Sequence, residues 1–427
     1  MIIVMKKNIV SVVSTLILIN LLLVSSLFAV QISDTVRMQA GYADEIYYSM
    51  TNGIVKTVPR AQWDIAFRTM KRSSSILTND GSGVVLYTYP YADTTGWATV
   101  DTAGLSTWKP MYNDPADWEN GAFSRNATGH PDYGWGKYND VTHNLVGDSL
   151  FIIKLRDGSF KKFWIVKKLS AADIYSFRYA NLDGSNENSV KQDLSGFTGE
   201  DFYGFSLVDN TPVSFEPPIA GWDLLFTKYM SVQPNGTPYL VTGVLCNKNA
   251  ASEKFHPVPF VFSDFGAGIW DSTRSSVGWD WKVFDMNTFT YRIVDSTVYF
   301  IKGMNGDIHK LYFTGFAGST TGVITFVKSR AAAAGVNDLA GNSTDIKVYP
   351  NPATDRIIIN ITGKTGEELS LILTDLSGRQ LRADRPGRLA DGPNVFSMDV
   401  TGVQPGVYFV TVLTAATKTV TKVIIVH

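Results

Sequence analysis

Asp-Gly and Asn-Gly pairs recur along this chain, and they restrict its fold more than any other sequence feature. Both residues of such a pair tolerate positive φ, which the tight connections of β-hairpins require. Short alternating apolar runs separate the turns, and few windows keep a helical period. In the clearest hairpin, 149–166, lysines alternate with Phe160 and the residues around Phe163, which predicts one solvated and one buried face. The body of the chain, about 30–330, is therefore predicted to be all-β and antiparallel.

Charge and cysteine content exclude several functional classes. The 427 residues carry 38 Lys+Arg against 39 Asp+Glu, a formal net charge of -1. A near-neutral chain has no general attraction for nucleic acid or for an anionic membrane surface, so neither is an expected partner. Cys246 is the one cysteine, which excludes intramolecular disulfides and CxxC-type metal or redox sites.

Sequence landmarks recur in the same order in the two halves of the body. They predict a duplicated antiparallel unit, with copy 1 at 30–190 and copy 2 at 191–330. In both halves a Trp-Asp-x-x-Phe motif comes first, a Gly-Trp pair follows, and a Lys/Gly/Lys hairpin comes last. The matched residues are Trp63-Asp64 with Trp222-Asp223, Gly134-Trp135 with Gly278-Trp279, Lys154 with Lys302, Gly158 with Gly306 and Lys162 with Lys310.

The Trp-Asp-x-x-Phe motif is interpreted as structural. A half-buried indole beside a carboxylate indicates a core tryptophan, with the Asp accepting bonds from nearby backbone donors. Asp64 and Asp223 each lack a titratable partner in sequence, so neither is predicted to be an acid/base catalyst.

The first 29 residues are predicted to be a secretory signal peptide. Lys6 and Lys7 precede an apolar run from Ile9 to Phe28, and small residues follow. The alternative is an uncleaved membrane anchor, since about 20 apolar residues span a bilayer. No other stretch approaches that length, so the mature chain is not expected to be an integral membrane protein.

The order of these landmarks resembles the HmuY family. The segments that carry the resemblance are WKVFDMNTFTYRIVDSTVYFIK in copy 2 and the looser WGKYNDVTHNLVGDSLFIIKLRDGSFKKFWIV in copy 1. The resemblance implies two HmuY-like β domains and capture of haem at the cell surface. The chain departs from the family pattern in having two copies and no lipoprotein cysteine after the apolar run.

Haem binding requires His or Met ligands and an apolar pocket. His130 and His143 are the candidate haem ligands, because both lie in loops among Tyr133, Trp135 and Tyr138 and could bracket a planar ligand. The alternative is that these are surface histidines without a role. The other candidates are weaker: His256 stands alone before a proline, and His309 aligns with Lys161 of copy 1, which predicts a solvated position.

The tail carries the most specific motifs in the chain. A small-residue linker at 331–343 precedes a predicted β-sandwich (Ig-like) of about seven strands at 344–427. The motifs YPNPATD from Tyr349, DLSGR from Asp375 and PGVY from Pro405 closely resemble the C-terminal sorting domain of the type IX secretion system. The resemblance implies a Bacteroidota-type cell, recognition by the type IX machinery and attachment to the outer-membrane surface.

No catalytic motif is found: there is no GxSxG, HExxH, P-loop or EF-hand pattern, and no metal site is predicted. The chain is expected to be a non-enzymatic surface binding protein, with haem as the ligand implied by resemblance and no other cofactor. The alternative is a glycan- or protein-binding adhesin without haem that uses the aromatics of segment 97–135. The aromatics of this adhesin hypothesis are Trp97, Trp108, Trp118 and Trp135. A secreted hydrolase with an unrecognised site is the third hypothesis.

Overall fold

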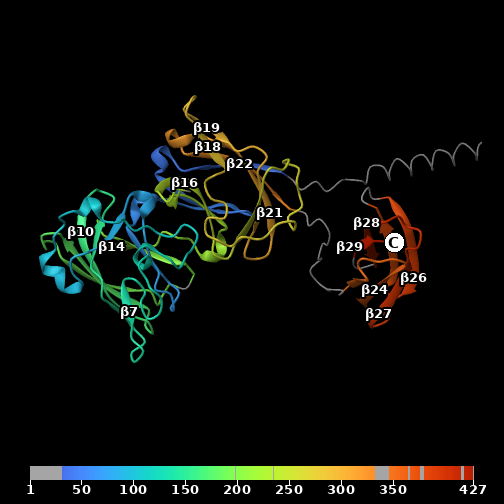
Figure 1. The fold of residues 1–427 in the computed structure, drawn as a ribbon, viewed down its shortest axis with the longest axis horizontal. Coiled ribbons are helices and arrows are strands. Elements are labelled where there is room, and N and C mark those ends of the chain that lie inside the picture. The colour runs from blue at the N-terminus through green and yellow to red at the C-terminus, as the bar shows by residue number, and fades with distance from the viewer. Residues whose placement is uncertain are drawn as a thin grey trace, which may run out of the picture. The chain divides into compact units, whose positions relative to one another are not determined.

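The computed structural model describes residues 31–426, apart from 198, 234, 332–345, 364–365, 376–378 and 415–417. The predicted signal peptide and all of the predicted linker except Ala331 lie outside the described residues. The chain divides into two compact units, 1–331 and 332–427 (Figure 1). Antiparallel sheets build both units, which confirms the all-β prediction.

The first half of the larger unit is a sandwich of two sheets. Its outer sheet runs β12-β11-β10-β9-β6, with the hairpin β7–β8 attached to β10, and its inner sheet runs β14-β13-β4-β5. Aromatic and aliphatic side chains from both sheets, such as Phe67, Phe163 and Phe177, fill the space between them. The strands are β4 (Ile65–Arg68), β5 (Ile76–Thr78), β6 (Val85–Thr88), β7 (Gly136–Tyr138), β8 (Leu145–Gly147), β9 (Phe151–Lys154), β10 (Phe160–Leu169), β11 (Ile174–Asn181), β12 (Asn188–Asp193), β13 (Phe202–Ser206) and β14 (Thr211–Val213).

The second sandwich has the same strand order. Its outer sheet is β1-β22-β21-β20-β17, its inner sheet is β3-β2-β15-β16, and the hairpin β18–β19 takes the place of β7–β8 (Figure 1). The strands are β1 (Ile32–Arg37), β2 (Asp44–Ser49), β3 (Gly53–Pro59), β15 (Leu224–Val232), β16 (Pro238–Cys246), β17 (Ala251–Phe255), β18 (Lys282–Asp285), β19 (Thr290–Ile293), β20 (Val298–Lys302), β21 (Ile308–Phe316) and β22 (Val323–Arg330).

Strand pairing differs from the expected boundaries of 30–190 and 191–330. Strands β1–β3 pair with the second sandwich, with Val36 opposite Ile324 and Tyr48 opposite Leu224. Strands β13 and β14 stay with the first sandwich through β4. The physical reason is that landmark order reveals the repeat but does not reveal which strands hydrogen-bond. Strands β1–β3, at the start of the body, complete the two sheets of the second sandwich, as β12–β14 complete those of the first.

The two inner sheets face each other, so the body has four β layers. The contact between them is a third apolar cluster that includes Trp63, Trp222, Tyr47 and Phe202. Trp118 of the first half meets Trp222 of the second edge-on, with ring centroids 6.4 Å apart. Aromatic pairs of this kind stabilise a core beyond their area burial, so the two sandwiches form one packed body.

The Trp-Asp-x-x-Phe motifs have the structural role expected from sequence. Oδ2 of Asp64 accepts hydrogen bonds from the backbone N–H groups of Leu207 and Val208, at 2.7 and 3.2 Å. Oδ2 of Asp223 accepts from the N–H of Met50 at 2.8 Å. Each carboxylate therefore ties the strand that it begins to the end of the neighbouring strand.

The predicted solvated face of the hairpin 149–166 is wrong at one lysine. Lys162 is 2% exposed, and its Nζ donates to the Trp97 carbonyl at 2.8 Å. Lys310, at the matching position of the second sandwich, is also buried and donates to the carbonyl of Phe260. A buried ammonium needs hydrogen-bond acceptors, and the loops over each outer sheet supply them.

The smaller unit is the expected β-sandwich, with sheets β23-β24-β27 and β26-β25-β28-β29 in its described part. Ile357, Ile359, Leu371 and Val410 contribute to its core. Its strands are β23 (Ile346–Tyr349), β24 (Arg356–Gly363), β25 (Glu368–Thr374), β26 (Gln380–Arg388), β27 (Gly392–Asp399), β28 (Gly406–Leu413) and β29 (Lys418–Ile425).

Replacing Val36 by Asp tests the pairing of β1. The Val36 side chain is fully buried in the second sandwich, so an unpaired carboxylate there should lower the free energy of unfolding by roughly 3 kcal/mol. Amide hydrogen exchange should lose protection in β20–β22 and keep it in β9–β11. Arg37→Asp, at the exposed neighbouring position, is the matched control. Selective loss of protection in β9–β11 would contradict the pairing.

Candidate functional site

The hairpin β7–β8 forms one wall of an open cleft of about 610 Å³. Three separate stretches of chain meet there: the segment after β4, the loop that leads into β7, and the turn after β10. The volume lies within the range of roughly 300–1,000 Å³ typical of small-molecule sites. The lining residues are Lys71, Arg72, Ser73, Ser74, His130, Tyr133, Tyr138, His143, Leu145, Ser170 and Ala171.

His130 and His143, the two predicted ligands, both line this cleft and both contact Tyr138. The Tyr138 hydroxyl and Nδ1 of His143 are 2.7 Å apart. The His130 ring lies 5.3 Å from the Tyr138 ring, centroid to centroid. Nε2 of His130 is 3.9 Å from Oδ1 of Asp140, and its side chain is 60% exposed. Because the hydroxyl of Tyr138 occupies Nδ1 of His143, Nε2 is the nitrogen that His143 can offer to a ligand.

The donor set of the cleft fits a haem held at the surface. An imidazole nitrogen is an iron ligand, the rings of Tyr133 and Tyr138 can lie against a macrocycle, and the exposed Lys71 and Arg72 can pair with its carboxylates. Leu145 is the one large aliphatic side chain in the lining. The apolar wall that would protect a haem from water is therefore small, and ligation by either histidine stays a prediction.

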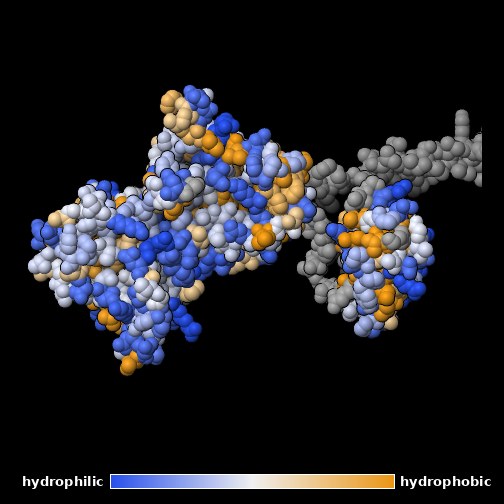
Figure 2. All heavy atoms as spheres, viewed as in Figure 1, coloured by the Kyte–Doolittle hydropathy of each residue, from blue (hydrophilic) through white to orange (hydrophobic). Residues whose placement is uncertain are grey.

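The hairpin β18–β19 repeats this geometry without the imidazole. Phe284 takes the place of Tyr138 and Phe289 that of His143, with φ of 52° at Phe289 and 57° at His143. The rings of Phe284 and Phe289 are 6.5 Å apart. Met286 at the tip is 70% exposed, and apolar residues gather on and beside this hairpin (Figure 2). The duplicated hairpin thus carries two different chemistries.

The alignment of hairpin β7–β8 with hairpin β18–β19 also corrects one of the residue pairs expected from sequence. The sequence comparison matched Trp135 with Trp279, but the buried counterpart of Trp135 is Trp281. Trp135 is 0% exposed and Trp281 is 1% exposed, each in the core of its sandwich. Trp279 is only partly buried and donates from Nε1 to the hydroxyl of Ser231.

The remaining candidate histidines occupy sites that support the fold. Nδ1 of His256 lies 2.9 Å from the hydroxyl oxygen of Thr297. His309, expected to be solvated, is 8% exposed. Its burial lowers its pKa, which favours the neutral imidazole. The register of β21 places this side chain inward, which an alignment with Lys161 does not reveal.

Most of the tryptophans proposed as a glycan platform are buried. Trp97, Trp118 and Trp135 are at most 8% exposed. The guanidinium of Arg178 covers Trp97 at 4.0 Å from its ring centroid. Trp108 is half-buried and lies 5.7 Å from Tyr91, which is 58% exposed. Of these four tryptophans, Trp108 is the one that can stack on a ligand without rearrangement of the fold, with Tyr91 beside it.

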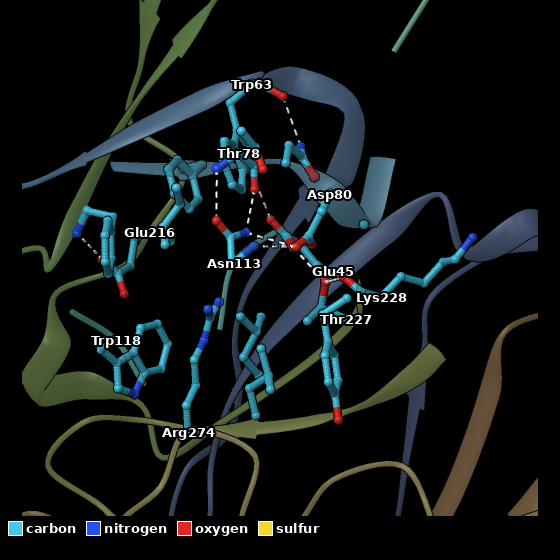
Figure 3. A pocket seen from close by; sticks show the side chains of 18 of the residues that line it. Glu45, Trp63, Thr78, Asp80, Asn113, Trp118, Glu216, Thr227, Lys228 and Arg274 are labelled. Atoms are coloured by element: carbon cyan, nitrogen blue, oxygen red, sulfur yellow. Dashed lines mark hydrogen bonds between the residues drawn. The ribbon is translucent and has the colours of Figure 1, made fainter. Parts of the chain in front are cut away.

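A buried polar cluster lies between the two inner sheets (Figure 3). Asn113 connects its members: Nδ2 donates to Oδ2 of Asp80 at 3.0 Å and to the carbonyl of Thr78 at 2.7 Å. Arg274 reaches into the cluster from the opposite side, its guanidinium 4.2 Å from the ring centroid of Trp118. The cavity is about 40 Å³, which is room for water rather than for an organic substrate.

Burial dominates the titration of the carboxyl groups in this cluster. It raises the pKa of Asp80 to about 7, against the field of Arg274. It raises the pKa of Glu216 to about 8, although this carboxylate accepts backbone bonds from Asp201 and Phe202. Glu45 also has a raised pKa because of burial. Carboxyl groups whose pKa values are raised by burial therefore surround the buried guanidinium.

Two further observations concern the described residues alone. Nowhere in these ranges do three His, Cys, Asp or Glu side chains converge in a way that could hold a metal ion. Among the same residues there is also no helix whose length and apolar character would suffice to cross a membrane.

Comparison with known proteins identifies the tail. Residues 347–426 match the model of the secretion system C-terminal sorting domain. A solved structure from a study of PorZ, a surface component of the type IX secretion system of Porphyromonas gingivalis, is similar at 12% identity with a TM-score of 0.15. The match covers 68% of this chain and 44% of that one, less than half of its length. No curated protein matches this chain.

The raised pKa of Asp80 predicts a pH dependence of stability. An Asp in the unfolded chain ionises near its ordinary pKa of 3.8, whereas folded Asp80 ionises near 7. Between these values the unfolded state binds fewer protons, so this group makes the free energy of unfolding fall as pH rises. Asp80→Asn removes that fall. The free energy of unfolding of the variant, relative to that of wild type, should therefore rise by up to about 4 kcal/mol between pH 4 and 8. Urea unfolding at several pH values measures it.

Asp93→Asn is the control of opposite sign. The Asp93 carboxylate is exposed and accepts bonds from the N–H and hydroxyl of Thr95, and these bonds lower its pKa. Its removal should cost stability at neutral pH and leave the wild-type fall in place. An unchanged pH profile in Asp80→Asn would show that Asp80 is ionised in the folded protein.

Proposed function

We propose that this chain is a non-enzymatic surface binding protein that the type IX secretion system exports and attaches to the outer membrane. The sorting domain at 347–426 supports export and cell-surface attachment. The body contributes two fused sandwiches, which we propose to be HmuY-like. Its buried polar cluster is too small for a substrate, and its open cleft carries binding groups rather than a catalytic pair.

The ligand site in this proposal is the cleft beside β7–β8, with haem as the ligand. The observation that carries it is that His130, His143, Tyr133 and Tyr138 line one cleft although they come from the loop before β7, from β7 itself and from the β7–β8 turn. His143 would offer Nε2 to the haem iron, which would accept it as a ligand. The hydroxyl of Tyr138 would hold the imidazole through Nδ1. Hydrogen-bond partners of this kind orient a metal-binding histidine and raise its basicity.

Haemin titration of the full chain tests the site. The wild type should give a Soret shift that saturates at one haem per chain, because the second hairpin lacks an imidazole. His143→Ala should weaken binding by at least about tenfold, and Tyr138→Phe by roughly 10-fold to 100-fold. His130→Ala shows whether the second imidazole takes part.

Phe289→Ala is the matched control, because this residue occupies the position of His143 in the second hairpin. It should bind haemin like wild type. The haem proposal fails if the wild type gives no spectral shift, or if His143→Ala and Phe289→Ala bind haemin equally well.

A glycan-binding adhesin is the second candidate, favoured by the accessible pair Tyr91 and Trp108. Aromatic faces of this kind can stack on sugar rings. Binding of the full chain to immobilised glycans that disappears in Trp108→Ala, with no haemin response, would favour this candidate over haem.

Removal of the tail tests export. A chain truncated after residue 343 should accumulate in the periplasm of a type IX-competent cell, whereas the full chain should reach the surface. Cell fractionation and protease accessibility measure the difference. Surface display of the truncated chain would contradict a sorting role for the tail.

A further inference from the structure

The first sandwich contains a built site for a guanidinium group, and its own chain fills it. Arg156 follows β9, and its NH1 lies 2.7 Å from Oδ2 of the fully buried Asp64. Its NH2 donates to the hydroxyl of Ser206 at 3.2 Å and to Oδ2 of Asp209 at 2.8 Å. Two carboxylates and a hydroxyl thus hold the forked donor set of an arginine.

The second sandwich repeats the backbone of this site. Asp64 N–H donates to the carbonyl of Phe205 at 2.9 Å, and Asp223 N–H donates to that of Tyr48 at 2.8 Å. These bonds and the matching bonds to the two carboxylates make Asp223 the counterpart of Asp64.

The acceptor side chains are repeated as well. The N–H of Asp209 donates to Oγ of Ser206 at 3.1 Å, and the N–H of Asn52 donates to Oγ of Ser49 at 3.2 Å. Ser49 therefore stands where Ser206 stands in the first sandwich, and Asn52 replaces Asp209. The carboxylate of Asp223, the hydroxyl of Ser49 and the amide of Asn52 line the same cleft.

The arginine itself is missing from the second copy. In the hairpin register that aligns Lys154 with Lys302, Met304 replaces Arg156, and its side chain is 48% exposed. Gly303 replaces the buried Leu155, and a Cβ at Gly303 would lie 2.7 Å from Oδ1 of Asp223. The two replacements leave an open cleft of about 250 Å³.

Other charged groups near this cleft have partners elsewhere. Asp307 pairs with Arg330 at 2.5 Å. Lys328 donates to the carbonyl of Met50 at 3.0 Å and lies 3.7 Å from Asp34. His309 is buried and its burial lowers its pKa, which favours the neutral form. In the described part of the chain, no ion pair within 4 Å reaches Asp223.

We propose that this cleft binds the guanidinium group of an arginine side chain from a partner polypeptide. Asp223 supplies the negative charge, and Ser49 and Asn52 accept the remaining N–H groups, as their counterparts do for Arg156. The arrangement favours Arg over Lys, because a planar fork matches several acceptors at once and an ammonium is a point charge. The cleft would thus bind a guanidinium group from another chain, whereas Arg156 supplies this group within the first sandwich.

The test uses the full chain and the peptide acetyl-Gly-Arg-Gly-amide, with citrulline in place of arginine as the neutral control. Calorimetry or NMR titration should give a dissociation constant on the order of 1 mM for the arginine peptide, as expected of one charge-assisted contact. Asp223→Asn should weaken binding at least about tenfold. The citrulline peptide should not bind.

Two variants make the test independent of folding defects. Met304→Arg should fill the cleft as Arg156 does, abolish peptide binding and raise the melting temperature. Arg156→Met should empty the first site, lower the melting temperature, and bind a second equivalent of peptide. The proposal is overturned if the wild type does not bind the arginine peptide, if the citrulline peptide or the same peptide with lysine in place of arginine binds as well, or if Met304→Arg binds like wild type.

Discussion

The body of this protein depends on hydrogen bonds between its first and last strands. Strand β1 pairs with β22, and β2 pairs with β15. Without β1–β3 the second sandwich would lose one edge of each sheet and part of its core, including Val36, Ile46 and Tyr48. The stacked inner sheets would lose Tyr47 and Val58. The four-layer arrangement, and with it the position of every cleft in the body, follows from this closure.

Duplication provided two copies of each structural device, and later replacements separated their chemistry. The two hairpins share the positive φ of His143 and Phe289, yet one offers Tyr138 and His143 and the other Phe284 and Phe289. The aspartates that begin β4 and β15 make matching backbone contacts, yet Asp64 pairs with Arg156, whereas no ion pair of the described residues reaches Asp223. The fold was kept by buried residues, so positions around the loops were free to change.

Sequence patterns were sufficient for the fold class, the repeat and the tail, because alternation, turn dipeptides and ordered landmarks report on local structure. They were not sufficient for the domain boundaries, since Ile32–Arg37 finds its partner strand at the other end of the body. They also misjudged burial at Lys162 and His309, whose surroundings come from distant loops and strands. His130 and His143 were named from sequence and line one cleft, and their role as ligands stays a prediction, whereas the presence of Lys71 and Arg72 in the same lining depends on tertiary contacts.

The closure by β1–β3 also affects the order in which the protein can fold. Residues 63–213 contain all strands of the first sandwich, so that half can form as soon as its own segment is available. The second half must wait for β15–β22 while β1–β3 present unpaired edges, and pairings this distant in sequence form slowly. A chain that crosses an envelope before maturing therefore has a long interval in which its earliest strands are open to aggregation, and chaperoning in that interval would protect them.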